Sequence, residues 1–276
     1  MTGGTAIVLA GGGERAVAWE LGVLVGLSRA GIDASSAQRL IGTSAGAYVA
    51  TLAAAGADLR LAADGKRGHG ARSDARAHAV DQAVAAWNEA ARGGLVEARR
   101  RLGALALAAD TPAEEDSLAA TAERLPAGDW PDRLVLTAVD AGRGERVAFR
   151  AGDGVPLAAA LAASRAVPGV MPPITIAGRR YIDGAVGSAT NADLAAGAAW
   201  AIVITPTPAH PPPNTLFGLW HAALEYEAHQ LEAAGTRVSV VRAGHADQAA
   251  MGPDLMSGAR RHEAFAAGER RGLLLQ

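Results

Sequence analysis

The chain of 276 residues contains no cysteine. Without cysteine there can be no disulfide framework, no thiol nucleophile and no thiolate-bound zinc or iron–sulfur cluster. An excess of one charge is also missing, because 26 lysines and arginines face 28 aspartates and glutamates, which leaves a net charge of −2. A balance this even argues against a protein built to bind nucleic acid.

Long hydrophobic runs are absent too. The most apolar stretch, residues 195–204, contains Gly197 and reaches about half of the roughly 20 residues that span a bilayer. The amino terminus has neither the basic region nor the apolar core of a secretory signal. No residues cluster at metal-ligand spacing, so we expect no metal and no other cofactor. Together these absences favour a soluble, cytoplasmic protein.

What the chain does contain is a regular alternation of strand, glycine turn and helix. Residues 5–10 predict a buried strand that ends at Gly11-Gly12-Gly13, and residues 14–30 predict a helix closed by Gly31. A second short strand over 39–42 runs into Thr43-Ser44-Ala45-Gly46 and an alanine-rich helix. This order of elements is typical of the beginning of a parallel α/β sheet. With 50% hydrophobic and 20% charged residues, the chain can bury the core that such a sheet needs.

The rest of the chain continues the same class of fold. Residues 57–125 predict a polar helical segment in which Asp110-Thr111-Pro112 restarts a helix, because Asp or Thr can cap it and Pro suits its first turn. No linker or repeat divides the chain, so we predict one α/β domain over residues 1–276. Further strands are expected at 133–139, 145–150, 174–177, 180–183, 200–205 and 237–242, with helices at 157–166 and 216–234.

A candidate nucleophile lies between the second strand and its helix. Gly42-Thr43-Ser44-Ala45-Gly46 fits the G-x-S-x-G pattern, in which flanking glycines permit a sharp turn that exposes the serine hydroxyl. The alternative is that Ser44 caps the helix and the glycines are ordinary turn residues. With one strand before that of the serine, the position in the chain does not fit an α/β-hydrolase, whose nucleophile follows several strands.

A candidate oxyanion hole follows the first strand. The three glycines at 11–13 can aim consecutive N–H groups into one cavity, and Arg15 adds a positive charge, unless it forms a surface ion pair. The same loop also satisfies the dinucleotide-binding pattern G-x-G-x-x-G/A. That alternative needs an acidic residue after the second strand, whereas Asp33 falls in a predicted loop.

The nucleophile needs a partner that accepts its proton. Asp183 ends a short apolar strand and precedes Gly184, which would place a carboxylate at the edge of the sheet; its alternative role is that of an Asp-Gly turn residue. For every histidine a surface or structural role is favoured, and these are His69, His78, His210, His221, His229, His245 and His262.

Taken in order, these motifs resemble the signatures of the patatin-like phospholipases. The resemblance rests on Gly11-Gly12-Gly13-Glu14-Arg15, Gly42–Gly46 and Asp183-Gly184-Ala185, with Ser164–Gly169 between the last two, and it covers residues 5–193. It implies a three-layer domain with a central, mostly parallel sheet. It also implies a catalytic dyad of nucleophile Ser44 and general base Asp183, with an oxyanion hole formed by the amides of Gly11, Gly12 and Gly13.

Two departures from the family pattern stand out. Ala16 replaces the usual glycine, which could crowd the substrate entrance, and Asn191-Ala192 replaces Asn-Pro, which predicts a looser loop. The resemblance further implies hydrolysis of acyl esters of phospholipids or neutral glycerolipids through an acyl-enzyme.

The physiological substrate and the oligomeric state do not follow from the sequence. Nine basic against six acidic residues in 57–109 suggest peripheral contact with an anionic lipid surface, although a solvated helix face explains them better. Two alternatives to a hydrolase stay open: a dinucleotide-binding protein, and a catalytically idle relative that binds lipid or a protein.

Overall fold

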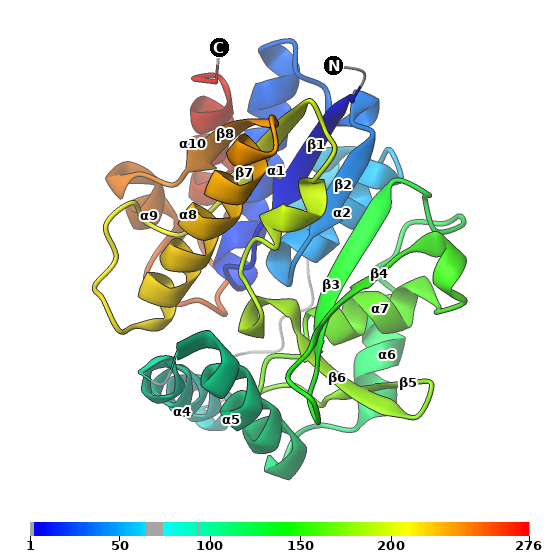
Figure 1. The fold of residues 1–276 in the computed structure, drawn as a ribbon, viewed down its shortest axis with the longest axis vertical. Helices are drawn as coiled ribbons and strands as arrows, with labels where there is room; N and C mark the ends of the chain where they lie inside the picture. Colours follow the sequence, from blue (N-terminus) through cyan, green and yellow to red (C-terminus); the bar gives the residue numbers. More distant parts are fainter. Residues whose placement is uncertain (1–2, 65–73, 93, 276) are drawn as a thin grey trace.

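The central strands of the sheet are short apolar segments that are buried on both faces. The computed structural model describes residues 3–64, 74–92 and 94–275, and its sheet has the strand order β5-β6-β3-β2-β1-β7-β8, with β4 paired to β3 (Figure 1). Neighbours in the run β3-β2-β1-β7-β8 are parallel. These five strands are β1 (Thr5–Leu9), β2 (Arg39–Gly42), β3 (Leu134–Asp140), β7 (Trp200–Thr205) and β8 (Arg237–Arg242).

Alternate side chains of each parallel strand enter two separate cores. Ile7 and Leu9 of β1 pack with helices on one face, whereas Ala6 and Val8 pack with a different set on the other. The first face is covered by α1 (Glu14–Arg29), α2 (Ala45–Ala54), α7 (Leu157–Ser164) and α10 (Arg261–Gly272), and the second by α8 (Leu216–Ala233) and a 3-10 helix (Ala192–Ala195). The expected class, a mostly parallel sheet between layers of helices, is confirmed.

Antiparallel strands extend the sheet beyond β3. The strand β4 (Arg146–Phe149) forms a hairpin with β3, and β5 (Ile174–Ile176) forms one with β6 (Arg179–Asp183), as the turns around Gly144 and Gly178 predict. The turn of the second hairpin places Ala177 at φ 49° and Gly178 at φ 75°. The strand β6 in turn pairs with β3, so this hairpin belongs to the same sheet.

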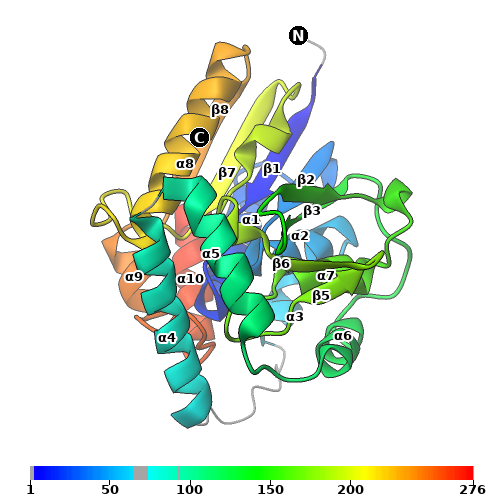
Figure 2. The same ribbon diagram turned by 60° about the horizontal axis from the view of Figure 1, so that its bottom comes forward.

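The predicted helical segment over 57–125 forms four helices in its described part; residues 65–73 and 93 lie outside it. Two of these helices, α4 and α5, lie side by side at one end of the sheet (Figures 1 and 2). Their inner faces share a core with the end of β6 and with α8, through Trp87, Leu102, Ile182 and Trp220. The helices are α3 (Leu59–Asp64), α4 (Asp74–Ala91), α5 (Gly94–Ala108) and α6 (Glu114–Ala122).

Two details differ from the sequence-based expectation. The helix α6 does not use Asp110 or Thr111 as its cap: it starts at Glu114 after Ala113, and three acidic residues in its first turn favour that start through the helix dipole. The carboxyl-terminal helices α9 (His245–Met251) and α10 were not predicted, because polar residues interrupt their apolar spacing. No helix within the described residues is long and apolar enough to cross a membrane.

Candidate active site

Ser44 lies at a strained turn between β2 and α2. Its backbone adopts φ 54° and ψ −114°, a conformation that non-glycine residues rarely adopt and that costs about 1–3 kcal/mol. The flanking glycines allow the close packing of this turn. A Cβ on Gly42 would overlap Ala47, and one on Gly46 would overlap the carbonyl of Leu9. Although Ser44 occupies the N-cap position of α2, its side chain makes no capping hydrogen bond.

The sheet brings the carboxyl ends of β2 and β6 together. Leu136 of β3 pairs with Gly42 of β2 on one edge and with β4 on the other. Ala138 pairs with Asp183 of β6 and, on its opposite edge, again with β4. The strands β2 and β6 therefore share one edge of β3 and point toward each other, so that residues that follow β2 meet the last residue of β6.

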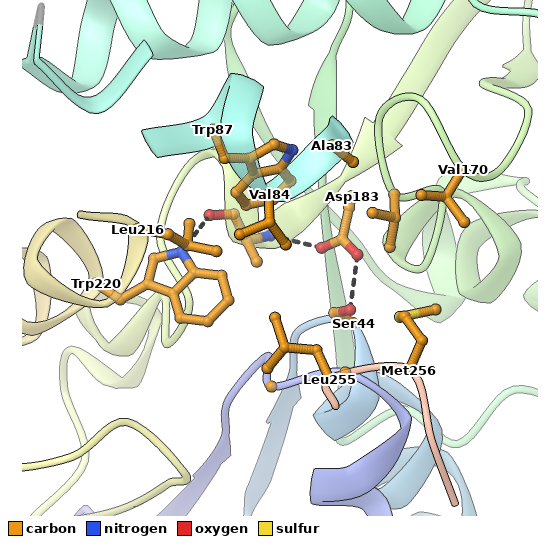
Figure 3. A pocket seen from close by; sticks show the side chains of 14 residues that line it. Ser44, Ala83, Val84, Trp87, Val170, Asp183, Leu216, Trp220, Leu255 and Met256 are labelled. Carbon is orange, nitrogen blue, oxygen red and sulfur yellow. Dashed lines mark hydrogen bonds between the residues drawn. The ribbon is translucent and has the colours of Figure 1, made fainter. Parts of the chain in front are cut away.

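At this meeting point Ser44 and Asp183 are hydrogen-bonded. The hydroxyl of Ser44 donates to Oδ2 of Asp183 at 2.6 Å (Figure 3). The other carboxylate oxygen accepts the N–H of Ala185 at 2.8 Å, so Asp183 also forms the local turn expected of an Asp-Gly pair. Gly184 is needed here because a Cβ would overlap Thr137, which lies between the two strand ends. Ser44 is 7% exposed and Asp183 is 1% exposed.

Burial changes the acidity of the carboxyl group. Loss of solvation raises the pKa of Asp183 from 3.8 to about 7. The hydrogen bonds from Ser44 and Ala185, and then the charge of Arg165, act in the opposite direction because they stabilise the carboxylate. A carboxyl group with a pKa near 7 is a far better proton acceptor than an exposed aspartate.

The glycine loop borders the pocket that holds Ser44 and Asp183. Gly12 and Gly13 line the same pocket as Ser44 and Asp183. Gly11 does not offer its amide, because that N–H donates to the carbonyl of Ala189 at 2.7 Å. The expectation of three donors is therefore wrong for Gly11. The amides of Gly12 and Gly13 have no hydrogen-bond acceptor among the residues that the structure describes.

Arg15 follows the loop at the start of α1 and forms no ion pair with the residues that the structure describes. Its side chain is buried, and its guanidinium donates to the carbonyl of Gly252 and to Gln248. Its backbone N–H donates to the carbonyl of Leu255 at 3.2 Å. The expected alternative of a surface pair is wrong, because the segment around Gly252 covers this helix start.

The two departures from the family pattern have different consequences from those expected. Ala16 is fully buried and does not line the pocket, so it does not crowd the entrance. The loop at Asn191-Ala192 is not loose. The N–H of Ala192 donates to Glu227 at 2.8 Å, a bond that proline could not form, and the side chain of Asn191 donates to Thr43 at 3.1 Å.

Beyond the polar groups of the site the pocket is apolar. Figure 3 shows Trp87 and Val84 of α4 on one side of it and Leu255 and Met256 on the other, with Trp220 of α8 beside them. Such a lining suits a hydrocarbon chain. The remaining apolar residues that line it are Ala83, Val167, Val170, Ala185 and Leu216.

Sequence reasoning did not single out these pocket residues. Trp87, Trp220, Leu255 and Met256 belong to helices and a loop without a motif, and an apolar residue that lines a pocket has the same pattern as one in a core. For Trp87 and Trp220, the available signal was that tryptophan is rare in this chain, which has five of them. Trp87 and Trp220 contact each other edge to face, with ring centroids 6.1 Å apart.

The other candidate residues lie away from this site. Asp33 caps a short 3-10 helix through the N–H of Ser35 at 2.8 Å and does not follow β2, as a dinucleotide site would require. His69 and the side chain of His78 fall outside the described part. Within that part, no histidine lines the pocket and no cluster of three metal-ligand side chains occurs.

The chain resembles two solved structures, VipD from Legionella pneumophila (12% identity, TM-score 0.48) and the type III effector protein ExoU (16% identity, TM-score 0.45). The similarity to VipD covers 99% of this chain and 66% of the VipD chain. The similarity to ExoU covers 98% of this chain and 52% of the ExoU chain. No curated protein sequence matches it. The model of the patatin-like phospholipase family matches residues 7–196, the region that carries both Ser44 and Asp183, and the chain belongs to that family.

Proposed function

We propose that this protein hydrolyses acyl esters of lipids with Ser44 as nucleophile and Asp183 as general base. The observation that carries the proposal is the 2.6 Å hydrogen bond between the two side chains at the base of an apolar pocket. Membership of the patatin-like phospholipase family supports a lipid substrate.

The first half of the reaction acylates Ser44. Asp183 takes the hydroxyl proton while Oγ of Ser44 attacks the ester carbonyl carbon, and the carbonyl oxygen becomes negatively charged. The amides of Gly12 and Gly13 donate to this oxygen, and each such donor is worth about 2.7–4 kcal/mol in acyl transfer. The tetrahedral intermediate then collapses, and Asp183 returns the proton to the leaving alcohol.

The second half regenerates the enzyme. Asp183, again a carboxylate, accepts a proton from water as the water oxygen attacks the acyl carbon. The acyl–Oγ bond breaks, the proton passes to Ser44, and a carboxylic acid leaves. The apolar wall formed by Trp87, Trp220 and Leu255 holds the acyl chain throughout and excludes bulk water from its length.

The decisive experiment combines a fluorophosphonate probe with ester hydrolysis. Wild type, Ser44→Ala and Asp183→Asn are compared with Ser36→Ala, an exposed serine, and Asp140→Asn, a buried carboxylate in β3. We expect labelling of the wild type and both control variants, none of Ser44→Ala, and labelling at least about 10²-fold slower in Asp183→Asn. A folded wild type that neither reacts with the probe nor cleaves any acyl ester would refute the proposal.

A further inference from the structure

One short turn contacts the backbones of both members of the dyad. Ser164 is the last residue of α7, and its Oγ accepts the N–H of Ser44 at 3.0 Å. Two residues later, the carbonyl of Ala166 accepts the N–H of Asp183 at 2.9 Å. We infer that the turn Ser164–Ala166 fixes the distance between nucleophile and base, and that Ser164 is a positioning residue for Ser44. This inference rests on the function proposed above.

The bond from Ser164 meets a specific need of Ser44. Ser44 follows the end of β2 and occupies the N-cap position of α2, so its N–H has no partner within either element. That N–H lies in a buried environment, where an unpaired donor is costly. Ser164 is fully buried and supplies the acceptor. The bond therefore stabilises the backbone conformation in which Oγ of Ser44 contacts Asp183.

Backbone hydrogen bonds hold the turn Ser164–Ala166 itself in place. The amides of Arg165 and Ala166 donate to Ala162 and Ala163, each one turn back along α7, at 3.1 and 3.2 Å. The N–H of Val167 donates to the carbonyl of Arg165 at 2.9 Å. Because both contacts with the dyad are made to backbone groups, they set where the two residues lie, whatever their side chains do.

A purely local role for Ser164 fits less well. A serine inside a helix usually bonds the carbonyl four residues earlier. The Oγ of Ser164 accepts its hydrogen bond from a residue 120 positions away in the sequence. A structural hydroxyl predicts lower stability with unchanged chemistry, whereas a positioning hydroxyl predicts a lower kcat with an unchanged KM. These two outcomes can be separated.

The test uses the full chain with Ser164→Ala, which deletes the acceptor, and Ser164→Cys, which keeps the volume but accepts hydrogen bonds weakly. The matched control is Thr236→Val, which removes a buried hydroxyl that donates to the carbonyl of Ala198. Ala198 lies just before β7 in the chain, at the end of that strand that is far from the dyad. For each we would measure kcat and KM for a short-chain ester. Hydrogen exchange of the Ser44 amide is followed by NMR.

We expect both Ser164 variants to lose roughly 10- to 100-fold in kcat, with KM unchanged, and the control to keep wild-type kinetics. The Ser44 amide should exchange roughly tenfold faster in both variants. A kcat within twofold of wild type in a folded Ser164 variant would overturn the inference, as would an unchanged exchange rate. If wild type proves inactive, the function fails, and the exchange rate alone still decides whether Ser164 positions Ser44.

Discussion

Gly42 and Asp183 pair with Leu136 and Ala138 on the same edge of one strand, with Thr137 between. This arrangement sets two strand ends against each other, one running with β3 and the other against it. A serine placed two residues after Gly42 therefore meets Asp183, 139 positions later in the chain, at hydrogen-bond distance. The antiparallel hairpin β5–β6 is what makes this possible, because a parallel strand on that edge would point the wrong way.

The pH dependence of the reaction should reflect the buried carboxyl group. Asp183 must be ionised to accept the serine proton, and its pKa is raised to about 7. We expect kcat/KM to rise about tenfold per pH unit below that value and to level off above it. Rates measured between about pH 5 and 9 on a neutral ester would show this limb. A plateau that begins near pH 4 would mean that Asp183 titrates as an ordinary aspartate.

Arg165 should affect the pH at which kcat/KM rises. Its positive charge favours the ionised form of Asp183, so Arg165→Gln should raise the pKa of Asp183 and shift the limb to higher pH. Activity at pH 6 should fall further than activity at pH 9. The matched control is Arg179→Gln, because Arg179 begins the same strand but pairs with Asp140 at 3.5 Å. A parallel shift in both variants would attribute the effect to net charge.

Stability should depend on pH in the sense opposite to that of most carboxylates. Because its folded-state pKa is raised, Asp183 binds a proton more tightly in the folded protein than in the unfolded chain. Its contribution is complete below about pH 4 and is lost as pH rises through about 7. Asp183→Asn removes this dependence. As pH rises through this window, the free energy of unfolding of Asp183→Asn should increase relative to that of wild type by up to about 1.4 kcal/mol per pH unit. Urea denaturation at each pH would measure this difference.

The glycine loop at residues 11–13 should not tolerate a methyl group. Gly13 has φ 75°, and a Cβ there would overlap the carbonyl of Leu255. Gly13→Ala should lower kcat/KM at least about 10²-fold through displacement of an amide donor. The control is Gly31→Ala, since Gly31 has φ 87° with open space around it. That variant incurs backbone strain alone and should keep its activity.

The outer wall of the pocket should limit the acyl chain. Leu255→Trp fills the pocket and should shift the preference among p-nitrophenyl esters toward shorter chains, while Leu255→Ala should extend it. Leu107→Trp on the exposed face of α5 is the control, since Leu107 is 49% exposed. Chain-length profiles that match wild type in both Leu255 variants would place the acyl chain elsewhere.

The elements of the sheet and both dyad candidates could be predicted from the sequence because their signals are local. Glycines at 11–13, 42 and 46 mark turns, and apolar periodicity marks the strands and helices between them. The meeting of Ser44 with Asp183 depends on strand pairing across the whole chain, which no local pattern encodes. The same holds for the amide of Gly11, whose partner Ala189 is distant in sequence.

The segment after β8 was the part of the chain least accessible to prediction. The burial of Arg15 depends on Gly252 and Gln248, which carry no motif. Helix α9 is fixed by Asp247, which accepts hydrogen bonds from Trp19 and Arg271. These are tertiary contacts between polar groups that are distant in the sequence, and no local sequence pattern marks them.

Leu255 and Met256 lie beyond residue 196, where the match to the family ends. The groups proposed to carry out the chemistry therefore come from one part of the chain, and part of the wall around the substrate comes from another. Mutations in the tail can alter which molecules fit without touching the reacting atoms. Substitutions at Leu255 or Met256 would therefore change the range of substrates of this chain and leave the proposed chemistry in place.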